Sequence, residues 1–327
     1  QMLKASNAGG NDEFGISVSI SGNYAIVGSF KEDTNGGDSG AAYIFERATD
    51  GSWNQVPTML KASNAGESDN FGYSVSIDGN YAIVGAYLED TSGSQSGAAY
   101  VFERTVDGSW NETQMLKASN AEEYDRFGFS VSIDGNYAIV GAWLEDTSGS
   151  DSGAAYIFER DTDGSWNQVP TMLKASNAGT GSSEYFGYSV SISGNYAIVG
   201  AANEDTSSNN AGAAYIFERG TNGTWTQVPT ILKASNVGDG TTQKFGHSVA
   251  ISGSYAIVGA KQEDTTAQNS GAAYVFERAT NGTWSEIKHI KASNVGASHA
   301  FGISVSISGN YAIVGAHKED TSGSQSG

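Results

Sequence analysis

Aromatic side chains recur at two places beside a repeated Phe-Gly-x-Ser-Val motif, and stacking is the chemistry they offer. In three copies the residue after Phe-Gly is aromatic, and in three the residue that ends the next apolar run is aromatic. In a hairpin these two positions are neighbours, so they would form flat platforms for a sugar or a partner's side chain. The predicted ligand-binding residues are Phe30, Tyr73, Tyr87, Phe129, Trp143 and Tyr188. The alternative is that these rings fill the gap between adjacent repeats.

Carboxylates form a second repeated pattern. A Glu-Asp pair precedes Thr six times along the chain, as at Glu32-Asp33 and Glu89-Asp90. Carboxylates and loop carbonyls are the ligands that calcium prefers, so a ring of such pairs is one candidate metal site. The alternative is that the pairs cap loop amides or are solvated. We therefore predict no cofactor, with calcium as the open alternative.

Catalytic patterns are absent from the sequence. Its four histidines occupy different places in the repeat, and the many serines have neither an elbow motif nor a paired base. The chain has no cysteine, which excludes disulfides and thiolate chemistry. We predict that the protein is not an enzyme.

Strands joined by short turns must position these side chains. The motif begins at Phe14, Phe71, Phe127, Phe186, Phe245 and Phe301, which gives six repeats of similar length. In the second repeat, residues 73–77 alternate in polarity and residues 81–86 are continuously apolar, which predicts a hairpin with a tight turn. Residues 98–104 and 110–119 are the expected third and fourth strands. Four antiparallel strands per repeat predict an all-β fold, a β-propeller with six or seven blades in the intact ring.

The repeat resembles the FG-GAP repeat, the propeller unit of integrin α chains and of many bacterial surface proteins. The resemblance lies in the Phe-Gly start, the Ile-Val-Gly-Ala close and the Gly-Ala-Ala-Tyr-x-Phe-Glu-Arg strand, and it covers nearly the whole chain. It implies a propeller used outside the cell for adhesion or recognition. Two features depart from the family: Tyr87 or Trp143 replaces its Pro, and a tight turn such as Ser21-Gly22-Asn23 replaces its calcium loop.

Composition limits the partners. The 327 residues carry a formal charge of −19, which repels phosphate backbones and anionic lipid. We therefore expect no nucleic-acid partner and no membrane insertion, since no apolar run reaches the length of a membrane helix. We expect residues 1–327 to form one propeller domain. Because residues 1–7 read as a fourth strand and a sixth third strand is missing, we also expect a piece of a longer chain.

The two ends of each predicted blade differ. One end has only tight turns, whereas the other has loops of about ten residues, and binding surfaces favour long loops on a rigid scaffold. The prediction is an extracellular or cell-surface recognition module that binds a glycan or a protein through the long-loop face. The alternative is a self-assembling subunit of a surface layer, coat or filament. The Arg of Phe-Glu-Arg, as at Arg47 and Arg104, is expected to form an ion pair or to stack between strands, and Lys61 or Lys117 to protect a sheet edge.

Overall fold

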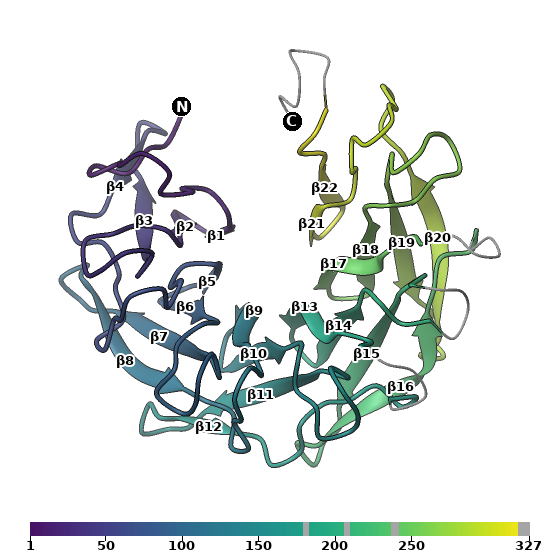
Figure 1. Cartoon of the computed structure of the whole chain (residues 1–327), viewed down its shortest axis with the longest axis horizontal. Coiled ribbons are helices and arrows are strands. Elements are labelled where there is room, and N and C mark those ends of the chain that lie inside the picture. The colour runs from purple at the N-terminus through teal and green to yellow at the C-terminus, as the bar shows by residue number, and fades with distance from the viewer. Residues whose placement is uncertain (179–182, 206–209, 237–241, 320–327) are drawn as a thin grey trace. The chain divides into compact units, whose positions relative to one another are not determined.

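The computed structural model describes residues 1–178, 183–205, 210–236 and 242–319. Every regular element in these ranges is a β-strand (Figure 1). Five four-stranded antiparallel sheets follow one another along the chain, and the last two strands form a small sheet of their own. In each large sheet the spatial order of the strands is their order in the sequence. This is the up-and-down arrangement of a propeller blade, so the predicted fold class is confirmed.

The strands have the following bounds. The first blade contains β1 (Val18–Ser21), β2 (Tyr24–Ser29), β3 (Ala41–Arg47) and β4 (Trp53–Gln55), and the second β5 (Ser74–Asp78), β6 (Tyr81–Ala86), β7 (Ala98–Arg104) and β8 (Trp110–Leu116). The third contains β9 (Phe127–Asp134), β10 (Tyr137–Ala142), β11 (Ala154–Arg160) and β12 (Trp166–Gln168), and the fourth β13 (Phe186–Ser193), β14 (Tyr196–Ala201), β15 (Ala213–Arg219) and β16 (Trp225–Leu232). The fifth contains β17 (Phe245–Ser252), β18 (Tyr255–Ala260), β19 (Ala272–Arg278) and β20 (Trp284–Ile290), and β21 (Ser304–Ser308) pairs with β22 (Tyr311–Gly315).

The chain divides into two compact units. The first comprises Gln1–Glu145 with Tyr156–Pro170, and the second comprises Asp146–Ala155 with Thr171–Gly327. The single domain, and the number of blades in an intact ring, remain predictions.

The hairpin of β5 and β6 shows how the sequence forms these strands. Val75 and Ile77 on β5 are buried, while Ser76 between them is half-buried, as the period of two predicts. Asp78 pairs with Tyr81, so only Gly79 and Asn80 form the turn. Gly79 has a φ of 55°, the left-handed conformation that this kind of turn requires.

Neighbouring blades of the first unit share one apolar core. Ile26 and Ile44 of the first blade pack in one cluster with Phe71 and Tyr100 of the second. The ring of Phe71 lies 5.5 Å from that of Tyr100, edge to face, and both side chains are fully buried. The Phe of Phe-Gly and the aromatics of the third strand therefore belong to the core.

Serine hydroxyls on the first strand of a blade, or directly before it, also join it to the next blade. Ser17 Oγ accepts a hydrogen bond from the backbone N–H of Val75 over 3.0 Å, and Ser19 Oγ accepts one from Ile77 over 3.2 Å. The same contact recurs in the second unit, where Ser191 Oγ accepts from the N–H of Ile251. The polar face of the first strand therefore satisfies backbone donors that the next blade would otherwise bury unpaired.

The Phe-Gly glycine is required by a close backbone contact. Gly72 has a φ of 92°, and a Cβ built on it would lie 2.2 Å from the carbonyl oxygen of Ala41 in the preceding blade. A Cβ on Gly28 would lie 1.9 Å from the carbonyl oxygen of Gly72. Two of the motif's glycines thus allow adjacent blades to approach backbone to backbone.

Residues 1–7 form no strand, in contrast to the prediction of a fourth strand. They nevertheless make the contacts of one: Gln1 exchanges two hydrogen bonds with the backbone of Trp53, as Gln114 of β8 does with Trp166. A fourth strand pairs only with the third strand of its own sheet, and no described strand occupies that place beside residues 1–7.

Candidate functional site

The two aromatic positions of one repeat lie side by side, as predicted. Tyr73 immediately precedes β5 and Tyr87 immediately follows β6, so the hairpin brings their rings together with centroids 4.5 Å apart. In the third blade, the rings of Phe129 and Trp143 lie 5.4 Å apart. These distances are typical of interacting aromatic pairs.

The ring contacts also continue from blade to blade. Phe30 of the first blade lies 5.4 Å from Tyr73 of the second, and Tyr87 lies 5.5 Å from Phe129 of the third. Each of these rings is half-buried. One continuous group of five rings therefore runs across three hairpins of the first unit, and we call Phe30, Tyr73, Tyr87, Phe129 and Trp143 the aromatic cluster.

Polar groups flank the aromatic cluster. The Arg126 guanidinium lies over the ring of Tyr87, 5.6 Å from its centroid, and Asn70 donates a hydrogen bond to the Tyr87 hydroxyl over 3.1 Å. Lys31 Nζ lies 5.3 Å from the centroid of Phe30. Arg126 and Asn70 were missed by the sequence analysis. Both directly precede Phe-Gly, a position that varies between repeats as the aromatic positions do, and this variation was the available signal.

The sixth predicted residue belongs to the second unit. The ring of Tyr188 lies 5.0 Å from the imidazole of His247, and the two planes are tilted by 38°. Burial raises the pKa of the Tyr188 hydroxyl. Tyr188 and His247 are the residues after Phe-Gly in two successive repeats, as Tyr73 and Phe129 are in the first unit. Each unit therefore has a ring contact between these positions, and in the second unit one of the rings is an imidazole. Whether the six predicted residues bind a ligand remains a prediction.

Five of the six glutamates of the Glu-Asp pairs are buried, and Glu319 is half-buried. Glu89 accepts hydrogen bonds from Asn64 and Thr91 and forms an ion pair with Lys117, while Asp90 is exposed. Glu32 and Glu263 have equivalent partners in their own repeats. Among the described residues, no group of three or more His, Asp or Glu side chains is placed to hold a metal ion. Asp320, in the last of the six pairs, lies outside the described residues.

These contacts correct the interpretation of the lysines. Lys61 and Lys117 do not protect a free sheet edge, because their ammonium groups reach the buried carboxylates of Glu32 and Glu89. Both roles expected for the arginines are observed: the Arg104 guanidinium lies 4.7 Å from the ring centroid of Tyr24 in the preceding blade, and Arg278 pairs with Glu218 over 3.3 Å. Arg160 and Arg278 make the equivalent contacts with Tyr81 and Tyr196.

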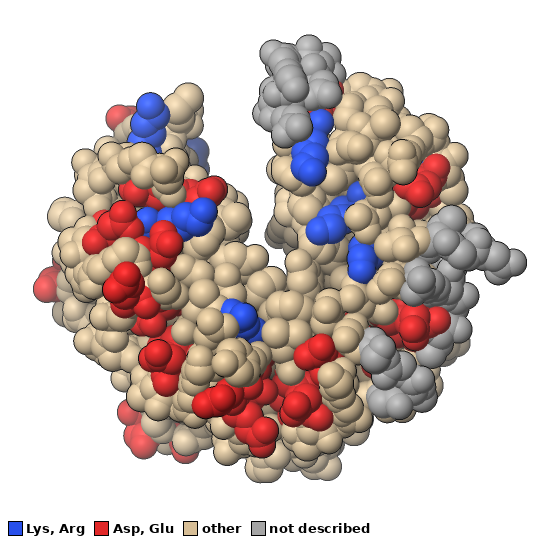
Figure 2. All heavy atoms as spheres, viewed as in Figure 1, with Lys and Arg blue, Asp and Glu red and all other residues tan. Residues whose placement is uncertain are grey.

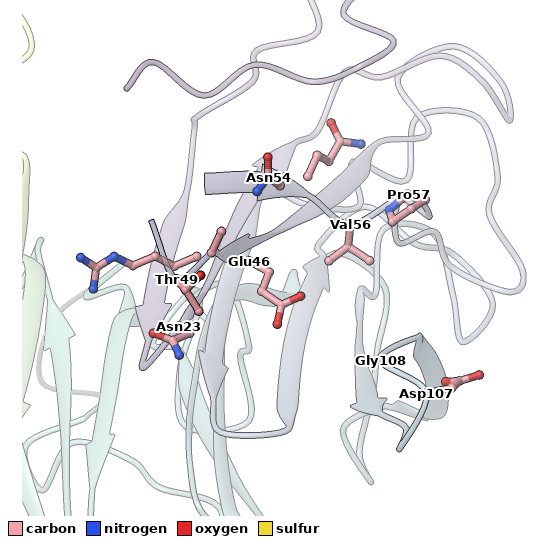
Figure 3. Close-up of a pocket in the computed structure, with 11 residues that line it drawn as sticks. Asn23, Glu46, Thr49, Asn54, Val56, Pro57, Asp107 and Gly108 are labelled. Carbon is pink, nitrogen blue, oxygen red and sulfur yellow. The ribbon is translucent and has the colours of Figure 1, made fainter. Parts of the chain in front are cut away.

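A groove of about 550 Å³ lies at the short-turn end of the first unit. Figure 3 shows it between the β3–β4 turn, the strand that leads to Pro57, and the β7–β8 turn at Asp107 and Gly108. Its carboxylates already have local partners: Glu46 accepts from the Tyr24 hydroxyl over 2.6 Å, and Asp107 accepts from Ser109. A similar groove recurs in the second unit around Pro229. We attribute both to the spacing of neighbouring blades.

The sheets and their repeated motifs define the class of protein: a β-propeller built from blades of one type. The chain belongs to the FG-GAP repeat family, whose repeat matches residues 1–45, 53–102, 110–158, 166–217, 225–276 and 284–327. No curated protein matches the sequence.

Two solved structures are similar in fold. A functionally unknown protein from Desulfotomaculum acetoxidans aligns with a TM-score of 0.52 and 13% identity, over 84% of this chain and 68% of that protein. A protein from Lactobacillus plantarum aligns with a TM-score of 0.51 and 17% identity, over 82% of this chain and 67% of the other. At these identities the likeness concerns the fold alone.

Proposed function

We propose that this chain is a binding module that recognises a carbohydrate through the aromatic cluster of the first unit, without catalysing a reaction. The observation that carries the proposal is the continuous contact of five half-buried rings at positions that vary between otherwise similar repeats. Half-buried rings keep part of their surface for a ligand while the fold holds them in place. Stacking on such a surface is how proteins bind the apolar faces of sugars.

Membership of the FG-GAP repeat family supports this proposal, because this repeat serves recognition in integrin α chains and bacterial surface proteins. It also supports a location outside the cell or on its surface. Among the described residues, no helix is long and apolar enough to cross a membrane. The flanking Arg126 and Asn70 would supply hydrogen-bond donors that orient sugar hydroxyls beside the stacked ring.

A glycan array tests the proposal. We expect saturable binding of at least one neutral glycan by the unaltered protein and its loss in Trp143→Ala. Ser109→Ala is the matched control, because Ser109 lies in the β7–β8 turn at the opposite end of the blade and should leave binding unchanged. Absence of any glycan signal would refute the carbohydrate assignment. A loss of binding in Ser109→Ala would mean that the short-turn end binds the glycan, and not the aromatic cluster.

The second candidate is a subunit that assembles with other copies. Val18 and Ile20 on β1 are 67% and 65% exposed, whereas their equivalents Val75 and Ile77 on β5 are buried against the preceding blade. Exposed apolar side chains on a strand favour pairing with another protein surface. Analytical ultracentrifugation over a range of concentrations distinguishes this candidate, since it predicts growing assemblies that Ile20→Lys disrupts.

A further inference from the structure

Basic side chains gather in the second unit of a chain whose formal charge is −19. Figure 2 shows Lys and Arg atoms over β17, β18 and the β21–β22 hairpin. Lys244 directly precedes β17, and Lys261 directly follows β18. We call this group the basic cluster, and its members are Lys244, His247, Lys261, His317 and Lys318.

The backbone brings these side chains together. The backbone N–H of Gln262 donates to the backbone carbonyl of Gln243 over 3.2 Å. Lys261 precedes Gln262 and Lys244 follows Gln243, so the two lysines lie on neighbouring backbone segments. Phe245 of β17 pairs with Ala260 of β18, and the irregularity that follows Phe245 contains His247. Lys261 directly follows Ala260, so His247 and Lys261 lie on the two sides of this residue pair. In the third blade the side chains at the positions of His247 and Lys261 are in direct contact, with ring centroids 5.4 Å apart.

Within the described residues, the charges around Lys261 and His247 are of one sign. Burial, then Lys244 and Lys318, lowers the pKa of Lys261, and burial, then Lys261, Lys244 and His317, lowers the pKa of His247 to about 3. Every described side chain that shifts the pKa of these two groups is basic. Two of the nearby glutamates have lysine partners of their own: Glu204 pairs with Lys233 over 2.5 Å, and Glu263 pairs with Lys291.

Lys244 is also held in a defined place. Its ammonium group donates to the side-chain oxygen of Asn203 and, over 3.5 Å, to that of Asn210. Uncompensated like charges destabilise the free protein, and groups perturbed in this way concentrate at binding sites. A negative charge placed among Lys244, Lys261 and Lys318 would remove that repulsion and gain charge-assisted hydrogen bonds.

We propose that the basic cluster binds the carboxylate of an acidic sugar, with Lys244 and Lys261 as the charged donors. The tilted pair of Tyr188 and His247 beside them offers the flat surface on which a sugar ring stacks. A single compact anionic group fits better than a long polyanion, because the overall charge of −19 repels an extended negative chain. This inference does not rest on the aromatic cluster, which belongs to the first unit.

Calorimetric titration at low salt with trigalacturonate, and with its uncharged methyl ester, tests the proposal on the full chain. We expect the acid to bind and the ester not to bind. Lys261→Gln should weaken binding of the acid by about tenfold or more, the value of one lost charge-assisted hydrogen bond. Lys288→Gln is the matched control, because Lys288 is an exposed lysine on β20 of the same unit and lies outside the basic cluster. It should leave the affinity unchanged.

Thermal melting separates a binding defect from a folding defect. Without ligand, Lys261→Gln should melt at the same temperature as the unaltered protein or higher, since it removes repulsion. The proposal is overturned if trigalacturonate does not bind, if the ester binds equally well, or if Lys288→Gln weakens binding as much as Lys261→Gln. Equal affinity for a triglutamate peptide would overturn the sugar assignment. Loss of neutral-glycan binding in Trp143→Ala reports on the other site only.

Discussion

Asn64 of the first blade donates a hydrogen bond from Nδ2 to Glu89 Oε1 of the second blade over 2.9 Å. The Oδ1 atom of the same side chain accepts a hydrogen bond from the Tyr100 hydroxyl over 2.7 Å. One asparagine therefore binds two buried groups of the next blade. The contact recurs in both units, in the pairs Asn7–Glu32, Asn120–Glu145, Asn177–Glu204 and Asn236–Glu263. Neighbouring blades are thus joined by a polar network as well as by their apolar core.

Removing the carboxylate should destabilise the fold. Glu89→Ala leaves Lys117 without its buried counter-ion and Asn64 without an acceptor, and we expect a loss of about 3–5 kcal/mol. Asn64→Ala should cost about 1–3 kcal/mol, the cost of a buried polar group without a partner. Denaturant unfolding measures both. Asp90→Ala, at the exposed neighbour, is the control, and an equal loss there would contradict the network.

Chelation should leave the melting temperature unchanged. The buried glutamates of the repeated pairs already bind lysine and asparagine, so their charge and lone pairs are satisfied without a cation. Melting curves with EDTA and with added calcium should superimpose. A fall of several degrees in EDTA would mean that a cation holds the loops together.

The strands and their core were predictable because they depend on local patterns. Alternation around Val75 and Ile77, the turn at Gly79 and the aromatics of the third strand each identify an element within a few residues. The neighbourhood of Tyr73 and Tyr87 followed from the same hairpin. The contact of Phe30 with Tyr73 joins two blades, and the sequence left open whether the aromatic residues contact each other in this way.

The polar partnerships could not be predicted for a related reason. Lys117 and Glu89 are 28 residues apart in the sequence. They come into contact only once the blade is built, and a local sequence pattern does not report this contact. A lysine on an outer strand has the same local pattern whether it protects an edge or pairs with a buried acid. The basic cluster could not be predicted for the same reason. Lys244 and Lys261 are 17 residues apart in the sequence, and only the hairpin of β17 and β18 brings them close together.

The glycine of Phe-Gly should not tolerate a side chain. Gly72→Ala places a Cβ 2.2 Å from the carbonyl oxygen of Ala41 at a φ of 92°, so the two blades must move apart. We expect a loss of several kcal/mol, above the roughly 1 kcal/mol typical of a left-handed alanine alone. Gly79→Ala is the matched control, since its φ is also positive but no atom lies within 4 Å. Similar losses in both variants would argue against the close contact.

Two neighbouring aromatics of the third blade should separate binding from stability. Phe127 is fully buried, and Phe127→Ala should cost about 3–5 kcal/mol through a cavity. Trp143 is only half-buried, so Trp143→Ala should cost clearly less while abolishing binding of the glycan identified on the array. Tyr87→Ala should behave in the same way as Trp143→Ala. Thermal melts decide the matter: if all three variants lose stability equally, the aromatic cluster fills space between blades.

His247 should make the protein sensitive to mild acid. Its folded pKa is lowered from the usual 6.5 to about 3 by burial and by Lys261, Lys244 and His317. As the pH falls below 6.5, the unfolded chain binds a proton at this imidazole and the folded chain does not. The stability that the neutral imidazole contributes is therefore complete above pH 6.5 and is lost progressively towards pH 3.

His247→Gln removes this titration while keeping a polar side chain of similar size. We expect the melting temperature of the variant to fall less between pH 7.5 and pH 4.5 than that of the unaltered protein. At pH 7.5 the imidazole is neutral in both the folded and unfolded chains, so any difference there measures packing against Tyr188 and is subtracted. If the two proteins lose the same number of degrees on acidification, His247 takes up its proton freely in the folded state, and the basic cluster is less crowded than its geometry indicates.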